Sequence, residues 1–330
     1  MPNPDIAATR PRLTVNWGLL LGAVVVGGIA VGVASGWTGA AHGAIEWRRV
    51  VWVLPGLVLL HLTQLLLGGI AWRGLFSGAR PGVAVFHRLR IVREGIDSLL
   101  PVAQIGGEIV GARLLARRGI ALSQAGASVV VDVTIEFLTQ LAFLAAGLCA
   151  LAWLSRDGAG SWLGVAFAVA GLLAALVLTQ RFGLLRLLER VMRAIAARWP
   201  ALAGASLDGL HAAAVGFYRR PAALLQSVAL HLLAWVLGSL ETWVVLNLLG
   251  VPVTPLQAFT VESLGMAARS AGFAIPAALG AQEGGFVLAA ASLGLPTGPA
   301  LALSLVKRVR EILVGLIGMA LWRLARRAAS

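Results

Sequence analysis

Long apolar stretches alternate with short polar segments along most of the chain. A helix of about 20 apolar residues crosses the roughly 30 Å hydrocarbon core of a bilayer. Six stretches are close to that length or exceed it: residues 17–36, 50–71, 123–153, 161–179, 222–249 and 299–322. The pattern predicts an all-α integral membrane protein with about six full transmembrane helices.

Two other segments are too polar and too interrupted to cross a membrane as single helices. The first covers residues 94–119 and the second covers residues 262–294. Their helix-breaking residues are Pro101, Gly106 and Gly107 in the first segment and Pro276, Gly284 and Gly285 in the second. Broken backbone at membrane depth is tolerated only where it is buried in protein or lines a watery cavity. Each segment is therefore predicted to form a re-entrant hairpin of two half-helices.

The two hairpins belong to an internal repeat. Residues 101–145 align with residues 276–320 without a gap at a constant offset of 175, with 12 identical positions. Glu108 matches Glu283, and Glu136 matches Glu311. We expect the second copy to enter the membrane from the opposite side. The chain is thus predicted to be one polytopic membrane domain, residues 1–330, with inverted repeats at about 94–153 and 262–322; in such folds the substrate site lies near the midplane, between the repeats.

Composition and charge support a membrane location and give an orientation. The chain is 59% hydrophobic and 12% charged, whereas soluble domains are about 25% charged. The net charge of +13 does not indicate nucleic acid binding, because the basic residues lie between the spans. With the N-terminus inside, 20 of the 27 basic residues are cytoplasmic, Arg90 and Arg93 among them, and four, including Arg269, are outside. The positive-inside rule then predicts that both termini are cytoplasmic.

The longest polar segment, residues 181–220, mixes arginines with leucines. It is predicted to be an amphipathic helix on the anionic cytoplasmic leaflet. A plain positively charged linker between spans is the alternative.

Several charged residues fall inside predicted spans or hairpins, where each costs at least about 2.5 to 3.5 kcal/mol unless it has a partner or a purpose. They are Glu108, Asp132, Glu136, Glu283, Lys307, Arg308, Arg310 and Glu311. We hypothesise that they line a polar cavity between the repeats. The three basic residues would bind an anionic or strongly polar headgroup, and the glutamates would balance that charge when the cavity is empty. The alternative is that they only pair with each other and hold the repeats together.

Catalytic, metal and cofactor chemistry have weaker support. The five histidines and the single cysteine are dispersed and show no metal-ligand spacing. No nucleophile elbow or phosphate-binding glycine loop is present. His231 and Glu241 could join a proton path, although helix packing explains them as well. We therefore expect a protein that is not an enzyme and that uses no metal or cofactor.

Residues 94–120, EGIDSLLPVAQIGGEIVGARLLARRGI, together with 274–294, AIPAALGAQEGGFVLAAASLG, and 304–318, SLVKRVREILVGLIG, resemble the membrane region of lysylphosphatidylglycerol synthases. The resemblance extends over about residues 15–325 and includes the stand-alone flippase-like proteins of this superfamily. Within that group, the chain looks most similar to membrane proteins associated with bacterial hopanoid biosynthesis. The positions that match the family pattern are Pro101, Gly107, Glu108, Pro276, Glu283, Arg308 and Glu311. The resemblance implies lipid translocation or binding in a bacterial inner membrane, without aminoacyl transfer.

The expected function is therefore movement of a lipid, such as a hopanoid or another polar-headed lipid, between leaflets. One alternative is an accessory protein that organises lipid-biosynthesis proteins through its basic cytoplasmic face. A second alternative is an intramembrane enzyme that acts on a lipid headgroup, which would yield a chemically altered lipid.

Overall fold

The computed structural model describes residues 47–78, 80–100, 106–155, 210–272, 275 and 278–327, with 164, 168 and 171 as isolated helical positions. The predicted span 17–36, most of the span 161–179, residues 181–209 of the basic segment, Pro101 and Pro276 lie outside the described residues.

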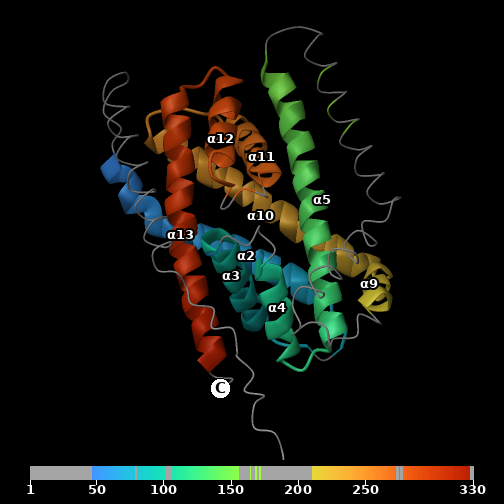
Figure 1. Ribbon diagram of the computed structural model, residues 1–330. Coiled ribbons are helices and arrows are strands. Elements are labelled where there is room, and N and C mark those ends of the chain that lie inside the picture. The colour runs from blue at the N-terminus through green and yellow to red at the C-terminus, as the bar shows by residue number, and fades with distance from the viewer. Residues whose placement is uncertain are drawn as a thin grey trace, which may run out of the picture.

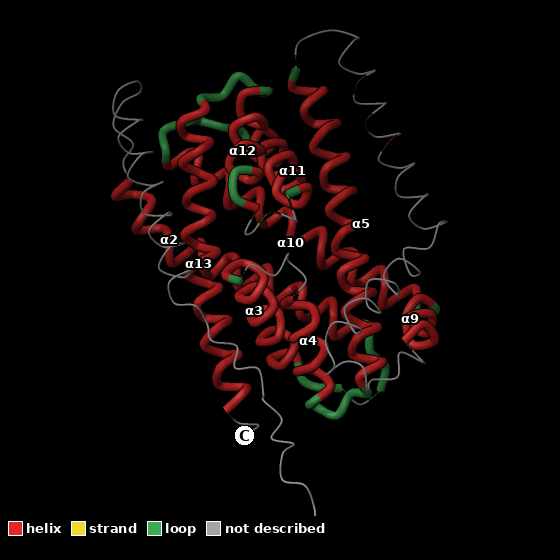
Figure 2. Tube along the Cα trace, viewed as in Figure 1, coloured by secondary structure: helices red, strands yellow, loops and turns green. Residues whose placement is uncertain are grey.

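All regular elements in these described ranges are helices, which confirms the all-α prediction for that part of the chain (Figures 1 and 2). They are α2 (Trp47–Gly74), α3 (Val83–Leu99), α4 (Gly106–Ala116), α5 (Leu122–Leu154), α9 (Leu210–Tyr218), α10 (Pro221–Leu248), α11 (Pro255–Ala271), α12 (Ala281–Ala291) and α13 (Thr297–Arg327). Local sequence explains where two of them begin. Pro221 and Pro255 occupy first-turn positions, where the backbone N–H that proline lacks would have no partner within the helix. Thr254 and Gln257 form a capping box before α11.

Three of the described helices are long and apolar enough to cross a membrane: Val51–Gly74, Leu122–Leu154 and Pro221–Leu248. They agree with the predicted spans 50–71, 123–153 and 222–249. Helix α13 has 31 residues, enough for a length of about 46 Å, but its central charges, from Lys307 to Glu311, interrupt its apolar surface.

The first limb of each hairpin is longer than predicted. Helix α3 begins at Val83 instead of residue 94, and α11 begins at Pro255 instead of residue 262. The sequence interpretation began the first hairpin at residue 94, just after Arg90 and Arg93, because arginines normally mark the membrane surface. In the structure α3 continues through both arginines, since carboxylates on neighbouring helices neutralise them.

The described helices pack as two halves with equivalent contacts. One half contains α3, α4 and α5, and the other contains α11, α12 and α13. Within each half the hairpin packs against the long helix that follows it: α4 against α5, and α12 against α13. The first helix of each hairpin also packs across, α3 against α13 and α11 against α5. Helices α2 and α10 contact each other. Figure 1 shows α5 and α13 running in opposite directions, with one hairpin in the lower and one in the upper half of the view.

Each half has its own apolar core. One core gathers around Trp72, Phe86 and Leu115, and the other around Val245, Phe286 and Leu303.

Two adjacent glycines of α12 give a matched test of hairpin packing. A Cβ at Gly285 would overlap the Ala268 Cβ on α11, whereas a Cβ at Gly284 would meet no atom within 4 Å. We expect Gly285→Ala to lower the free energy of unfolding by about 1–3 kcal/mol through overpacking. Gly284→Ala should be neutral or stabilise by up to about 1 kcal/mol through helix propensity. Thermal unfolding in detergent micelles checks both, and equal effects would contradict the close α11–α12 contact.

Candidate functional site

A polar cavity of about 450 Å³ lies between the two halves. Helices α2, α3, α4, α5, α10, α11 and α13 all contribute to its wall. The last turns of α3 and α11 line it through Asp97 and Ser98 on one side and Arg269 and Ser270 on the other. The first helix of each hairpin therefore ends at the same cavity.

The first group of charges, the Asp132 cluster, consists of Arg90, Arg93, Glu108, Asp132, Glu136 and His231. Asp132 on α5 is completely buried and accepts hydrogen bonds from Arg90 at 3.1 Å and from Arg93 at 2.9 Å. Glu136 pairs with Arg90 at 2.8 Å, and Glu108 pairs with Arg93 at 2.5 Å. Arg93 thus joins α4 to α5, because it bridges Glu108 and Asp132. Arg90 bridges two carboxylates of α5 and shares Asp132 with Arg93.

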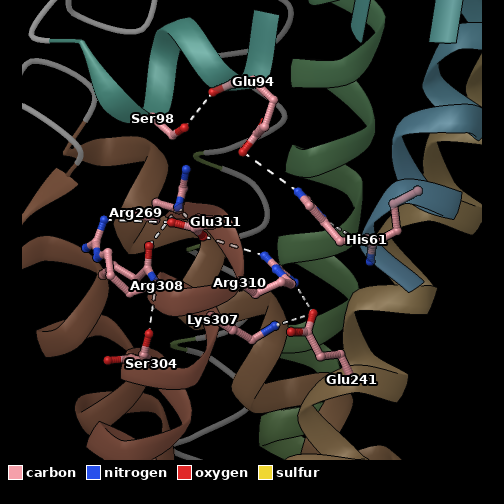
Figure 3. Close-up of polar contacts among 12 residues, drawn as sticks. His61, Glu94, Ser98, Glu241, Arg269, Ser304, Lys307, Arg308, Arg310 and Glu311 are labelled. Carbon is pink, nitrogen blue, oxygen red and sulfur yellow. Dashed lines mark hydrogen bonds and ion pairs between the residues drawn. The ribbon is translucent and has the colours of Figure 1, made fainter. Parts of the chain in front are cut away.

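The second group, the Lys307 cluster, consists of Glu241, Glu262, Arg269, Lys307, Arg310 and Glu311. Lys307 Nζ, with a side chain that is 1% exposed, lies 3.3 Å from Glu241 and 3.0 Å from Glu262. Figure 3 shows Arg310 between Glu241 and Glu311, and its guanidinium contacts both. Arg269 on α11 pairs with Glu311 at 2.5 Å.

One repeat position in the two clusters carries opposite charges, whereas the equivalent residues Glu136 and Glu311 carry the same charge. Asp132 and Lys307 are equivalent positions at the offset of 175, and both are buried. Each pairs with a residue of opposite charge on the first helix of its own hairpin, Arg90 on α3 or Glu262 on α11. Each half thus holds a buried ion pair between its long helix and the first helix of its hairpin, and the two pairs have opposite polarity.

The predicted site residues fall into three sets. Glu108, Glu136, Arg310 and Glu311 line the cavity. Asp132 and Lys307 are buried behind its wall. Glu283 and Arg308 pair with each other at 2.7 Å and are not part of the lining.

The described hairpin glycines allow close backbone packing. A Cβ at Gly107 would overlap Asp97 Oδ2, and the Gly107 N–H donates to Asp97 at 2.8 Å. Gly106 begins α4, and Gly284 and Gly285 belong to the first turns of α12.

Three arginines that the sequence interpretation placed at the membrane surface belong to the interior instead. Arg90 and Arg93 are buried, and Arg269 lines the cavity. The count of cytoplasmic and external basic residues therefore included three that lie inside the fold. The missed signal is the spacing of Arg90, Arg93, Glu94 and Asp97, which places four charges on one face of a helix.

The cavity has more carboxylates than cations. Its acidic lining residues are Glu94, Asp97, Glu108, Glu136, Glu241, Glu262 and Glu311, and its arginines are Arg90, Arg93, Arg269 and Arg310. Counting every carboxylate as ionised and the histidines as neutral, the lining has a formal excess of three negative charges. Apolar lining residues, Leu65, Val133, Phe137, Trp235 and Met266, complete the wall, and Val133 and Phe137 are exposed.

Such a wall can hydrogen-bond a polar group and accommodate apolar atoms beside it. Within the described ranges, no group of three or more histidine, cysteine or acidic side chains could hold a metal ion.

Comparison with known families gives one match. The family described as Lysylphosphatidylglycerol synthase TM region matches residues 15–318, a range that contains both hairpins, both charge clusters and the cavity. Comparisons with curated proteins and with solved structures found no match. The family match and the apolar helices together make this a membrane-embedded protein of a lipid-related family. The chain belongs to the family of the lysylphosphatidylglycerol synthase membrane region.

Proposed function

We propose that the protein moves a polar-headed lipid, such as a hopanoid or another lipid with a strongly polar headgroup, between the two leaflets of a bacterial inner membrane. The observation that carries the proposal is the charged cavity between two equivalent halves of a membrane-embedded fold. Charged walls inside a membrane protein are costly and mark substrate or ion pathways. The lipid-related family is a second support.

The proposed topology has six full spans and two re-entrant hairpins that enter from opposite sides, with both termini cytoplasmic. The opposite directions of α5 and α13 favour this arrangement, and so does the crossed packing of α3 on α13 and of α11 on α5. Rocking of one half against the other would expose the cavity to each leaflet in turn. The basic cytoplasmic face would contact anionic lipids and could also contact lipid-biosynthesis proteins.

The charge balance of the cavity limits the class of lipid headgroup that it can bind. Lys307 and Arg310, expected to bind an anion, are each engaged by carboxylates, and so is Arg308. An added anion would meet an excess of negative charge, whereas a neutral polyol or a group with a positive charge would not. The protein acts as a transporter in this proposal, because the lipid leaves the cavity chemically unchanged.

The test is lipid movement in reconstituted vesicles, with headgroup-labelled phosphatidylethanolamine and a labelled hopanoid that a membrane-impermeant reagent quenches from outside. Glu136→Gln removes a cavity charge whose side chain is 37% exposed, while Arg90 keeps Asp132 as a partner. We expect this variant to fold and to move lipid at least about tenfold more slowly, a loss of roughly 1.4 kcal/mol.

Glu283→Gln is the matched comparison, because Glu283 carries the same charge and lies outside the cavity lining. If lipid movement is lost in Glu283→Gln alone, the lipid site lies at the contact between Glu283 on α12 and Arg308 on α13, and not in the cavity. No acceleration by the wild type would contradict lipid movement, and an altered lipid in mass spectra would favour an enzyme.

A further inference from the structure

Two cavity carboxylates differ from the other described acidic residues. Seven of the nine described carboxylates lie within 4.0 Å of an arginine or lysine nitrogen. Glu94 and Asp97, three residues apart at the end of α3, have no such contact with any residue that the structure describes. Asp97 accepts the backbone hydrogen bond of Gly107. The only ionisable partner of Glu94 within that distance, among the described residues, is His61 on α2, whose Nε2 lies 3.8 Å from Glu94 Oε1.

The hydrogen bonds around His61 determine which ring nitrogen carries its hydrogen. Gln64 Nε2 donates to the carbonyl oxygen of Ala234 at 3.2 Å, so Gln64 presents its Oε1 to His61. His61 Nδ1 lies 2.7 Å from that oxygen and donates to it. A neutral imidazole has one N–H, so Nε2 is left with a lone pair. That atom is buried without a hydrogen-bond partner among the described residues.

His61 Nε2 therefore points its lone pair at the carboxylate of Glu94, as Figure 3 shows for the two side chains. Two acceptors that face each other repel. One proton between them would replace the repulsion with a charge-assisted hydrogen bond, which is stronger inside a protein than in water. His61 and Glu94 therefore need only one added proton to form this hydrogen bond.

The surrounding charges connect this pair to the other half of the fold. Arg269 on α11 and Arg310 on α13 act electrostatically on Glu94. Glu241 on α10 interacts with His61. On α3 itself Asp97 interacts with Glu94, and Glu108 on α4 interacts with Asp97. Loading the pair would make the cavity one charge less negative, and it would act on the same arginines that hold Glu241 and Glu311.

We propose that His61 and Glu94 form a proton-binding site and that each lipid passage through the cavity is coupled to one proton bound there. This inference rests on the proposed lipid movement. A proton from water adds to the Nε2 lone pair, the resulting imidazolium donates to Glu94, and no other bond changes. When the cavity opens to the other side, the proton returns to water. A proton gradient would then drive the lipid without a nucleotide.

The coupling is tested in vesicles of phosphatidylethanolamine and phosphatidylglycerol with the labelled lipid, at zero membrane potential and a pH difference of about one unit. One proton per lipid gives a leaflet ratio of about ten at equilibrium. In His61→Gln and Glu94→Gln, whatever their rate of movement, the lipid that moves should reach a ratio of about one. His87→Gln is the control, since His87 bonds to the Leu62 carbonyl oxygen at 3.1 Å and lies outside the cavity lining. A wild-type ratio of one, with lipid still moving, overturns the coupling and leaves the proposed function intact.

A second measurement needs no lipid substrate. Nitrogen NMR of histidine-labelled protein in micelles, with the His61 signal assigned by its loss in His61→Gln, should show neutral His61 protonated at Nδ1 and gaining its second proton at Nε2. Neutral His61 with hydrogen on Nε2 overturns the proton site, because that hydrogen would already bond to Glu94. The expected tautomer together with no lipid movement by the wild type contradicts the proposed function instead.

Discussion

Lys307→Met is expected to lower the free energy of unfolding by about 3–5 kcal/mol, the usual effect of removing one partner from a buried ion pair. Lys307 is the only cation within 4.0 Å of Glu262 in the described structure, and both side chains are almost fully buried. Methionine fills a similar volume but leaves the Glu262 charge uncompensated. Unfolding of the purified protein in detergent micelles, followed by circular dichroism, measures the change.

The control for this prediction is the double variant Lys307→Met with Glu262→Gln. Glu241 keeps Arg310 as its partner, and the amide introduced at position 262 is neutral, so no buried charge is left alone. We expect most of the lost stability to return. A double variant no more stable than Lys307→Met would show that the lysine matters through packing, for example on the Phe286 ring, and not through Glu262.

Asp132→Asn should lower the free energy of unfolding by about 3 kcal/mol, at the low end for a buried pair. Arg90 keeps Glu136, and Arg93 keeps Glu108, so each arginine retains one anion. The asparagine cannot neutralise the two guanidinium groups that meet at Asp132. The same unfolding measurement applies.

Glu136→Gln provides the comparison, one helical turn along α5 from Asp132. Its carboxylate is 37% exposed and has one cationic partner, so the expected loss is about 1 kcal/mol or less. Equal losses in the two variants would contradict the view that burial makes Asp132 the centre of its cluster.

The helical segments on both sides of each break could be predicted from the sequence, because they depend on local patterns. Proline and glycine interrupt apolar stretches at equivalent positions, and the repeat aligns Glu108 with Glu283. The helical character of the described residues and the family resemblance were confirmed for the same reason. Whether all six spans and the inverted hairpins form as predicted stays a prediction.

The pairing of charges could not be predicted, because it depends on which helices meet across the fold. Arg90 and Arg93 follow a basic segment and precede a hairpin, a position that usually indicates the membrane surface. Only the contact of α3 with α4 and α5 brings them to Glu108 and Asp132. The role of His61 likewise depends on Glu94, which reaches it from a different helix.

The order in which the ion pairs appear along the chain gives α13 a special place during synthesis. Arg90 and Arg93 meet Asp132 within the first half, so those charges can be neutralised as soon as α5 has been made. Glu241 and Glu262 precede their cations and remain uncompensated until Lys307 and Arg310 follow on α13. Helix α3, which already packs against α2 and α4, also acquires its contact with α13 only then. A nascent chain that stops before α13 would hold two carboxylates without cationic partners within the bilayer. Membrane quality control could use these carboxylates to distinguish an unfinished protein from a finished one.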